Sequence, residues 1–253
     1  MKIVIATGIF PPDIGGPATY VRQIAPELAA RGHDVVVVTY RDAGVSIAHD
    51  TSYRVVGVSR RVPRGLRHML YFFAVLRVGR GAGVVFAQDP VSSGLPALFA
   101  AKIRGAKFFI KIDGDYAWEQ ARQRFGVTDS IDDFQHRRYG IRTELLRRIQ
   151  GFVVNSADLV VTPSDYFRRL VSGWTRNPEK VHRVYNGVSL ADIHCPARGD
   201  AERAKVIFSA GRLVPWKGFA ALIGILTDLP GWRLVIAGDG PERESLKFKV
   251  KSL

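Results

Sequence analysis

Lys2–Val21 reads KIVIATGIFPPDIGGPATYV, and this stretch decides the fold. Its first six residues form a largely β-branched apolar run, which is typical of a parallel strand covered on both faces. The glycine- and proline-rich loop Gly8–Pro17 follows, and apolar residues at helical spacing then predict a helix over Ala18–Arg31. Gly32 stands where it can cap that helix. A strand, a glycine-rich turn and a helix in this order predict the first unit of a parallel α/β sheet.

The same alternation of strand and helix continues along the chain. Further strands are predicted over Val35–Thr39, Tyr53–Val58, Val84–Ala87, Lys107–Ile112, Leu159–Thr162 and Val181–Val184. Further helices are predicted over Leu66–Arg80, Gly94–Arg104, Tyr139–Phe152 and Ser164–Val171. Strands alternating with helices indicate a parallel sheet with helices on both faces, so residues 1–190 are expected to form one Rossmann-like domain.

A change in composition marks a second domain. Residues 191–204 are polar and without periodicity, which predicts a linker. The alternation then restarts, with strands at Val206–Ala210 and Arg233–Ala237, a helix near Phe219–Leu229 and another from about Glu242. Two strands with one crossover leave an open sheet edge and an uncovered face. We therefore expect residues 205–253 to form an incomplete second Rossmann-like domain.

The composition narrows the class of protein. The 253 residues are 47% hydrophobic and 24% charged, as in a soluble globular protein, and no apolar stretch reaches the ~20 residues that cross a bilayer. The opening residues do not match a signal peptide, and Cys195 is the single cysteine, so we expect a cytoplasmic protein without disulfides. The net charge of +14 attracts phosphorylated substrates, anionic lipid or nucleic acid. No RNA-binding or zinc-finger pattern accompanies it, which argues against nucleic acid.

Three glycine-containing loops follow predicted strands. Gly15 and Gly16 lead into a helix whose N-terminus can bind an anion, although the spacing is not that of a dinucleotide site and a plain turn is an equal alternative. Arg212 and Lys217 flank a loop that can hold a pyrophosphate, unless both charges are simply solvated. Gly238 and Gly240, after the last strand, let a backbone approach a ligand or merely close a tight turn.

Together these motifs resemble a known family. VIFSAGRLVPWKGF followed by LVIAGDGPERESL resembles the donor-binding half of family 4 glycosyltransferases with the GT-B fold, and the first half agrees through RGHDVVVVT, NSADLVVTPSDYFRRL and VYNGVSLADI. The resemblance implies transfer of a sugar from a nucleotide diphosphate sugar to a saccharide or lipid-linked acceptor, with retention of configuration. It also implies cell-envelope polysaccharide or glycolipid synthesis, an acceptor-side first domain, and neither a metal nor another cofactor.

The resemblance assigns the donor site by position. Arg212 and Lys217 match the basic pair that neutralises the donor diphosphate, while Gly15 and Gly16 match the loop of the first domain near the same phosphates. Gly238 and Gly240 are counted with the donor-binding residues. A later pair of glutamates, which in the family holds the donor sugar and ribose, lies beyond this terminus.

The acidic segment after the strand Lys107–Ile112 departs from the family pattern. Asp113 stands near the place where many members have a histidine, so it is the candidate catalytic residue beside Arg212 and Lys217. Asp89, Asp115 and Glu119 are candidates for acceptor binding. Asp113-Gly114-Asp115 also spells DxD, which could hold Mg²⁺ or Mn²⁺, but short acidic turns are common and the basic loop already supplies cations.

Two alternatives stay open. The segment Arg60–Arg80 combines large apolar residues with arginines, so it is either a core helix with solvated ends or a basic amphipathic helix at the anionic inner face of the membrane. The rival to a transferase is a non-catalytic α/β module that binds a phosphorylated ligand or an anionic membrane surface.

Overall fold

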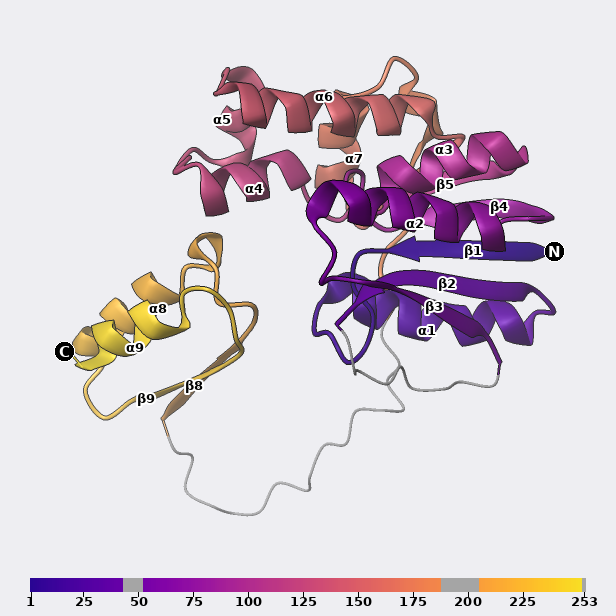
Figure 1. Cartoon of the computed structure of the whole chain (residues 1–253). Helices are drawn as coiled ribbons and strands as arrows, with labels where there is room; N and C mark the ends of the chain where they lie inside the picture. The colour runs from indigo at the N-terminus through magenta and orange to yellow at the C-terminus, as the bar shows by residue number, and fades with distance from the viewer. Residues whose placement is uncertain (43–51, 188–204, 252–253) are drawn as a thin grey trace. The chain divides into compact units, whose positions relative to one another are not determined.

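The computed structural model describes residues 1–42, 52–187 and 205–251 (Figure 1). The chain divides into two compact units, Met1–Val188 and Ser189–Leu253. The predicted linker, residues 191–204, and Cys195 within it lie outside the described residues.

The first unit is built on a seven-stranded parallel sheet of order β3-β2-β1-β4-β5-β6-β7. Its strands are β1 Lys2–Thr7, β2 Asp34–Arg41, β3 Arg54–Ser59, β4 Ala82–Ala87, β5 Lys107–Lys111, β6 Leu159–Thr162 and β7 Val181–Arg183. The order runs outward from β1 in both directions, so the chain changes direction between β1 and β4. In such sheets ligands bind at the carboxyl ends of the strands near this switch point. The α/β, Rossmann-like fold class is therefore confirmed.

Helices cover both faces of this sheet. They are α1 Gly16–Ala30, α2 Arg64–Val78, α3 Gly94–Arg104, α4 Tyr116–Arg124, α5 Ile131–His136, α6 Ile141–Ser156 and α7 Asp165–Ser172, with a 3₁₀ turn η1 at Pro178–Lys180. The central strands are buried on both faces because their side chains alternate: Ile3 and Ile5 pack toward α1, whereas Val4 and Ala6 belong to the larger core under α2 and α3. The continuous apolar run at the N-terminus is thus explained.

The structure corrects the prediction in one segment. Two short helices, α4 and α5, lie where no helix was predicted. Both begin at capping side chains, because Asp115 accepts a hydrogen bond from the Trp118 N–H and Ser130 accepts one from the Asp133 N–H. Their sequences are mostly polar and lack a clear apolar period, so local capping and tertiary packing, rather than an apolar stripe, mark these helices.

The second unit is a two-stranded parallel sheet with two helices. Strands β8 Val206–Ala210 and β9 Arg233–Ala237 pair in register, and α8 Phe219–Ile225 and α9 Arg243–Lys251 follow them, with 3₁₀ turns η3 Pro215–Lys217 and η4 Leu226–Asp228. Four buried side chains form one cluster, Leu213, Phe219, Ile223 and Leu246, and Val214 is buried as well. Neither strand contains a buried residue, and Phe208 is 66% exposed. Val235, the partner of Phe208 in the pairing, is exposed too, so no described residue covers this face of the sheet.

Candidate functional site

The glycine-rich loop after β1 ends at the N-terminus of α1. Gly15 is the residue before the helix, no side chain caps this end, and the first turn contains no acidic residue. A Cβ on Gly15 would lie 2.6 Å from Ile9 Cδ1, so the end of the Ile9 side chain would have to move to admit one. A Cβ on Gly16 would meet nothing within 4 Å. The helix N-terminus therefore faces open space at Gly16, as anion binding requires.

At the end of β5, Asp113 forms an ion pair that the sequence did not reveal. Lys111 Nζ lies 2.6 Å from both carboxylate oxygens of Asp113. Lys111 is only 1% exposed, and its Nζ sits 4.3 Å from the ring centre of Tyr20 in α1. Burial, followed by the charge of Asp113, raises the pKa of Tyr20. The candidate catalytic carboxylate is thus held beside the first turns of α1 by a buried cation.

Asp115 has a structural role. It is 1% exposed, caps α4 through the Trp118 N–H at 3.1 Å, and accepts hydrogen bonds from Gln135 Nε2 at 2.8 Å and Gln150 Nε2 at 3.1 Å. Both of its oxygens are therefore engaged inside the protein. Because Asp113 is paired with Lys111 and Asp115 is buried, the Asp113-Gly114-Asp115 turn does not present two available carboxylates to a cation.

Asp89 is engaged in a similar way after β4. Its carboxylate accepts hydrogen bonds from the N–H groups of Val91, Ser92 and Ser93 and from both serine hydroxyls. These bonds fix the turn that leads into α3. The acceptor-binding roles of Asp89 and Asp115 remain predictions, and the bonds in the structure account for both residues without an acceptor.

Glu119 stays close to the Asp113 turn. A Cβ on Gly114 would lie 2.6 Å from Glu119 Oε1, so Glu119 folds over the glycine that follows Asp113. Glu119 is partly buried in the first turn of α4. Of the predicted acidic residues in the first unit, Asp113 and Glu119 are the two that the structure brings together at a partly exposed position.

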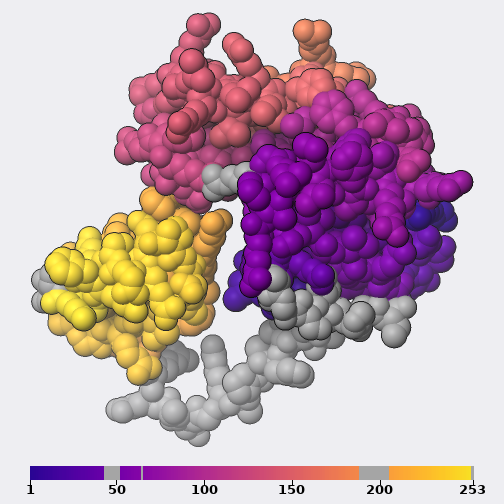
Figure 2. Space-filling view, viewed as in Figure 1, coloured from indigo at the N-terminus to yellow at the C-terminus, as the bar shows by residue number. Residues whose placement is uncertain are grey.

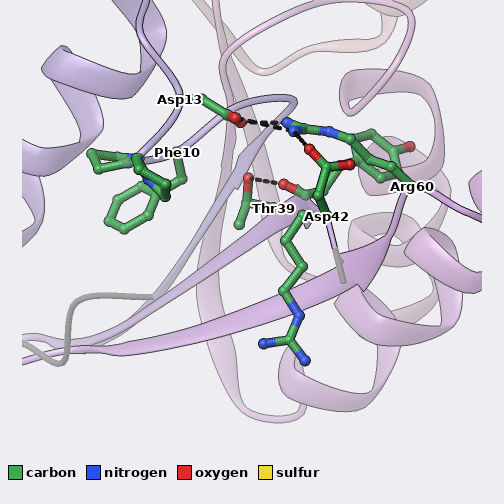
Figure 3. A pocket seen from close by; sticks show the side chains of 9 residues that line it. Phe10, Asp13, Thr39, Asp42 and Arg60 are labelled. Atoms are coloured by element: carbon green, nitrogen blue, oxygen red, sulfur yellow. Dashed lines mark hydrogen bonds and ion pairs between the residues drawn. The ribbon is translucent and has the colours of Figure 1, made fainter. Parts of the chain in front are cut away.

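A pocket beside the carboxyl ends of β2 and β3 was not predicted (Figure 3). Arg60 points between Asp13 and Asp42: its guanidinium pairs with both oxygens of Asp13 and lies 3.2 Å from Asp42 Oδ2. The pocket of about 160 Å³ is lined by these three residues together with Phe10 and Thr39, among others. Arg60 is 47 residues from Asp13 in the chain, so no local pattern could have indicated the pair.

A second, more open pocket of about 420 Å³ shares Asp13 and Arg60 and extends to Gly8. Tyr40 lines it, donates a hydrogen bond of 2.7 Å to the Ser92 carbonyl, and lies under the guanidinium of Arg67 at 5.2 Å. Burial, with a contribution from Asp89, raises the pKa of Tyr40, so its hydroxyl stays protonated. The carboxyl ends of β1, β2 and β4 therefore lie next to one another around this pocket.

In the second unit, Arg212 and Lys217 lie on the loop after β8, and both are exposed. Within residues 205–251 neither side chain forms an ion pair. Lys217 closes the 3₁₀ turn η3, and Gly218 after it takes the left-handed φ of 74° that starts α8. The predicted basic pair is thus available to a ligand.

Close packing between two loops explains why glycine occupies positions 238 and 240. A Cβ on Gly238 would lie 1.9 Å from the Gly211 carbonyl oxygen, and one on Gly240 would lie 2.4 Å from the Leu213 carbonyl oxygen. Backbone bonds join the same loops, because Gly211 N–H donates to Ala237 and Leu213 N–H donates to Asp239. The two glycines therefore let the loop after β9 brace the loop that carries Arg212. Their donor-binding role stays a prediction.

Two curated proteins are similar to this chain in sequence. A lipopolysaccharide core biosynthesis glycosyltransferase, LpsD, of Rhizobium meliloti is 32% identical over 137 residues, which are 52% of this chain and 37% of that protein. An alpha-monoglucosyldiacylglycerol synthase of Streptococcus pneumoniae is 23% identical over all of this chain and 59% of its own length. The chain thus spans about half the length of these relatives.

Solved structures share the fold at low identity. The lipopolysaccharide outer core galactosyltransferase WaaB matches all of this chain and 65% of its own, with a TM-score of 0.60 and 17% identity. S. aureus TarM, in complex with UDP, matches 100% of this chain and 75% of its own, with a TM-score of 0.69 and 9% identity. A UDP-N-acetylglucosamine 2-epimerase from Listeria monocytogenes matches 99% of this chain and 65% of its own, with a TM-score of 0.56 and 12% identity.

The family models settle the assignment. Residues 195–253 match the model for glycosyl transferases group 1, and residues 15–187 match the glycosyl transferase 4-like domain. Both resemblances agree with the GT-B fold class. Because the second match covers most of the chain, this protein belongs to the glycosyl transferase 4-like family.

Proposed function

We propose that this chain is part of an enzyme that transfers a sugar from a nucleotide diphosphate sugar to a saccharide or lipid-linked acceptor in cell-envelope glycan synthesis. The observation that carries the proposal is the exposed pair of cations, Arg212 and Lys217, on a braced loop at the carboxyl end of β8. The two curated relatives act in lipopolysaccharide core and glucosyldiacylglycerol synthesis, which supports an envelope acceptor.

The chemistry that we propose is mostly electrostatic. The bond between the sugar anomeric carbon and the diphosphate oxygen breaks, and the leaving diphosphate takes the electron pair. Arg212 and Lys217 stabilise that developing charge, the guanidinium through a planar fork and the ammonium as a point charge. An acceptor hydroxyl attacks the same face of the sugar, and a diphosphate oxygen takes its proton. We further propose that configuration is retained and that no metal takes part.

Asp113 has a place in this proposal on the acceptor-side unit. It is partly exposed, held by Lys111, and close to the first turns of α1. A fixed carboxylate can orient a sugar hydroxyl by accepting its hydrogen bond. Glu119, on the other side of the Gly114 turn, is the second acidic residue that we assign to this role.

The test of the donor site is a titration of UDP, GDP and ADP into the chain and its variants by calorimetry. Losing one charged hydrogen-bond partner typically costs about 1.5–3 kcal/mol, so Arg212→Ala and Lys217→Ala are expected to weaken binding roughly ten- to a hundredfold. Arg212→Lys recovers only part of the affinity, because an ammonium cannot form the planar fork. The matched control is Arg233→Ala, an exposed arginine at the opposite end of β9, which leaves affinity unchanged.

The results of these titrations distinguish a transferase from a non-catalytic binding module. Affinity that is unchanged in both alanine variants removes the donor site from this loop. Binding of nucleotide without consumption of any nucleotide sugar, in the presence of saccharide or lipid acceptors, favours the non-catalytic binding module instead.

A further inference from the structure

Helix α2 has two apolar faces, and the first of them packs into the protein. Tyr71, Val75 and Val78 are buried against the sheet in the larger core. The alternative that Arg60–Arg80 includes a core helix is therefore confirmed for this face. An inner face of this kind is sufficient to hold a helix on a parallel sheet.

The opposite face of α2 is also apolar, and it is exposed. Leu66, Met69, Leu70 and Phe73 recur at the i, i+3, i+4, i+7 spacing, and all four are between 41% and 55% exposed. In Figure 2, the surface of α2 faces the viewer on the first unit. An isolated exposed apolar residue is ordinary, but a stripe along a helix is not.

Two neighbouring helices continue this exposed surface. On α3, Phe99 and Ile103 are exposed one turn apart, and on α6 the exposed stripe runs through Ile141, Leu145 and Phe152. The rings of Phe99 and Phe152 are 6.2 Å apart, which joins α3 to α6. Arg104 of α3 donates to the Leu76 carbonyl of α2 at 2.7 Å, which joins the other two helices. We call these nine residues the outer helical face: Leu66, Met69, Leu70, Phe73, Phe99, Ile103, Ile141, Leu145 and Phe152.

The charges around the outer helical face are almost all positive. Arg77, Lys102 and Arg148 are exposed on α2, α3 and α6, and none of them forms an ion pair within the described residues. Neither α2 nor α3 contains an acidic residue, and the one acidic residue of α6, Glu144, is paired with Arg147 at 3.1 Å. Asp89 is the only acidic residue between Asp50 and Asp113 in the sequence.

We infer that the outer helical face docks the protein on an anionic lipid bilayer. Large apolar side chains would enter the boundary between headgroups and acyl chains, while the arginines and lysine stay at the level of the phosphates. The three helices carry an excess of positive charge, with Glu144 as their one acidic residue, and this excess favours an anionic membrane over another protein surface of mixed charge. No helix among residues 1–42, 52–187 and 205–251 is long and apolar enough to span a bilayer. Membrane docking through this face does not depend on the donor chemistry.

The experiment is cosedimentation of the chain with phosphatidylcholine vesicles, with and without phosphatidylglycerol. Phe73→Ser and Phe152→Ser are each expected to lower the partition coefficient onto anionic vesicles about tenfold, since each removes a large apolar side chain from the lipid. The matched control is Phe248→Ser on α9, where the phenylalanine is 76% exposed in the second unit. This control leaves binding unchanged.

A second set of variants tests whether the arginines of the outer helical face contribute to vesicle binding. Arg77→Gln and Arg148→Gln are each expected to weaken binding to anionic vesicles about fivefold and to leave the weak binding to neutral vesicles unchanged. Arg22→Gln on α1, which covers the other face of the sheet, is the control. Raising the salt from about 0.1 M to about 1 M shortens the Debye length from about 10 Å to about 3 Å and releases the protein.

Three results would overturn the inference. The first is equal loss of binding in the control variants, and the second is equal binding of the wild type to neutral and anionic vesicles. The third is a dimer in solution, measured by light scattering, that Phe73→Ser dissociates, because the face would then belong to a second copy. Circular dichroism of each variant confirms that the exposed substitutions leave the fold intact.

Discussion

The charged side chains at the carboxyl ends of the strands have different partners in the two units. In the first unit, each of four aspartates accepts a hydrogen bond from, or forms an ion pair with, another residue of that unit: Asp13, Asp89, Asp113 and Asp115. In the second unit the two cations of the β8 loop are exposed and without an ion pair among the described residues. A charge engaged in folding contributes to stability, whereas one left exposed on a braced loop is available to a ligand.

The largest effect that we expect tests the brace of the β8 loop. In Gly238→Ala the new methyl group meets the Gly211 carbonyl oxygen, so the loops must separate. We expect a loss of about 3 kcal/mol or more from the stability of the second unit, whose described residues form a cluster of only four buried side chains. Hydrogen exchange of β8 and β9, measured by mass spectrometry, reports this unit separately from the first.

The control for this loop is Gly224→Ala in α8. A Cβ there meets nothing within 4 Å, and alanine favours a helix over glycine by about 1 kcal/mol. Exchange in β8 and β9 should therefore slow slightly. If Gly238→Ala exchanges like the wild type, the two loops do not brace each other.

The next largest effect is a loss of stability in an Asp113 variant, which tests whether Asp113 is catalytic or structural. Asp113→Ala leaves the buried ammonium of Lys111 without its ion-pair partner. Removing one partner of a buried ion pair lowers the free energy of unfolding by about 3–5 kcal/mol. The loss is smaller here because Lys111 keeps its contact with the Tyr20 ring. The double variant Lys111→Met/Asp113→Asn removes both charges and should recover most of that stability, measured by urea unfolding. A loss of activity in Asp113→Ala alone would therefore not identify a catalytic residue.

The transfer activity of the double variant shows whether Asp113 contacts a substrate or serves only as the partner of Lys111. Folded but inactive protein supports contact between Asp113 and a substrate. Full activity in the double variant would restrict Asp113 to the role of a partner for Lys111. No coupling between the two substitutions would contradict the ion pair itself.

The smallest effect is a pH dependence of stability at the amino ends of β5 and β6. Burial alone would raise the pKa of Asp158, but hydrogen bonds of 2.9 Å from Lys107 Nζ and from the Phe108 N–H outweigh it and lower the pKa. A carboxylate with a lowered pKa stabilises the fold above its unfolded pKa of about 4, and this contribution is lost as the pH falls through the lower folded value.

Asp158→Asn should therefore destabilise the protein at pH 7 by less than about 1 kcal/mol, because the pair is partly exposed. The difference from the wild type, measured by thermal unfolding, should shrink below about pH 4. A difference that persists unchanged at low pH would attribute the effect to the backbone contact with Phe108 rather than to charge.

Much of the fold was predictable because its signals are local. Parallel strands are marked by continuous apolar runs whether or not both faces are covered, so Lys2–Thr7, Leu159–Thr162 and Arg233–Ala237 were predicted with the bounds that the structure has. The loop with Arg212 and Lys217 was predicted for the same reason, since a glycine-bounded turn after such a run is readable from sequence. Helices α4 and α5 were missed because capping side chains, not apolar spacing, define them.

The sequence by itself determined the parallel α/β class, the family and the position of the basic loop, because each depends on residues that are neighbours in the chain. Only the tertiary structure decided which charges are engaged and which faces are covered. Arg60 meets Asp13 across 47 residues, Gln150 reaches Asp115 across 35, and the outer face of α2 is exposed because β-strands fill only its inner side. Such pairings depend on where folding brings distant side chains, and composition and spacing do not contain that information.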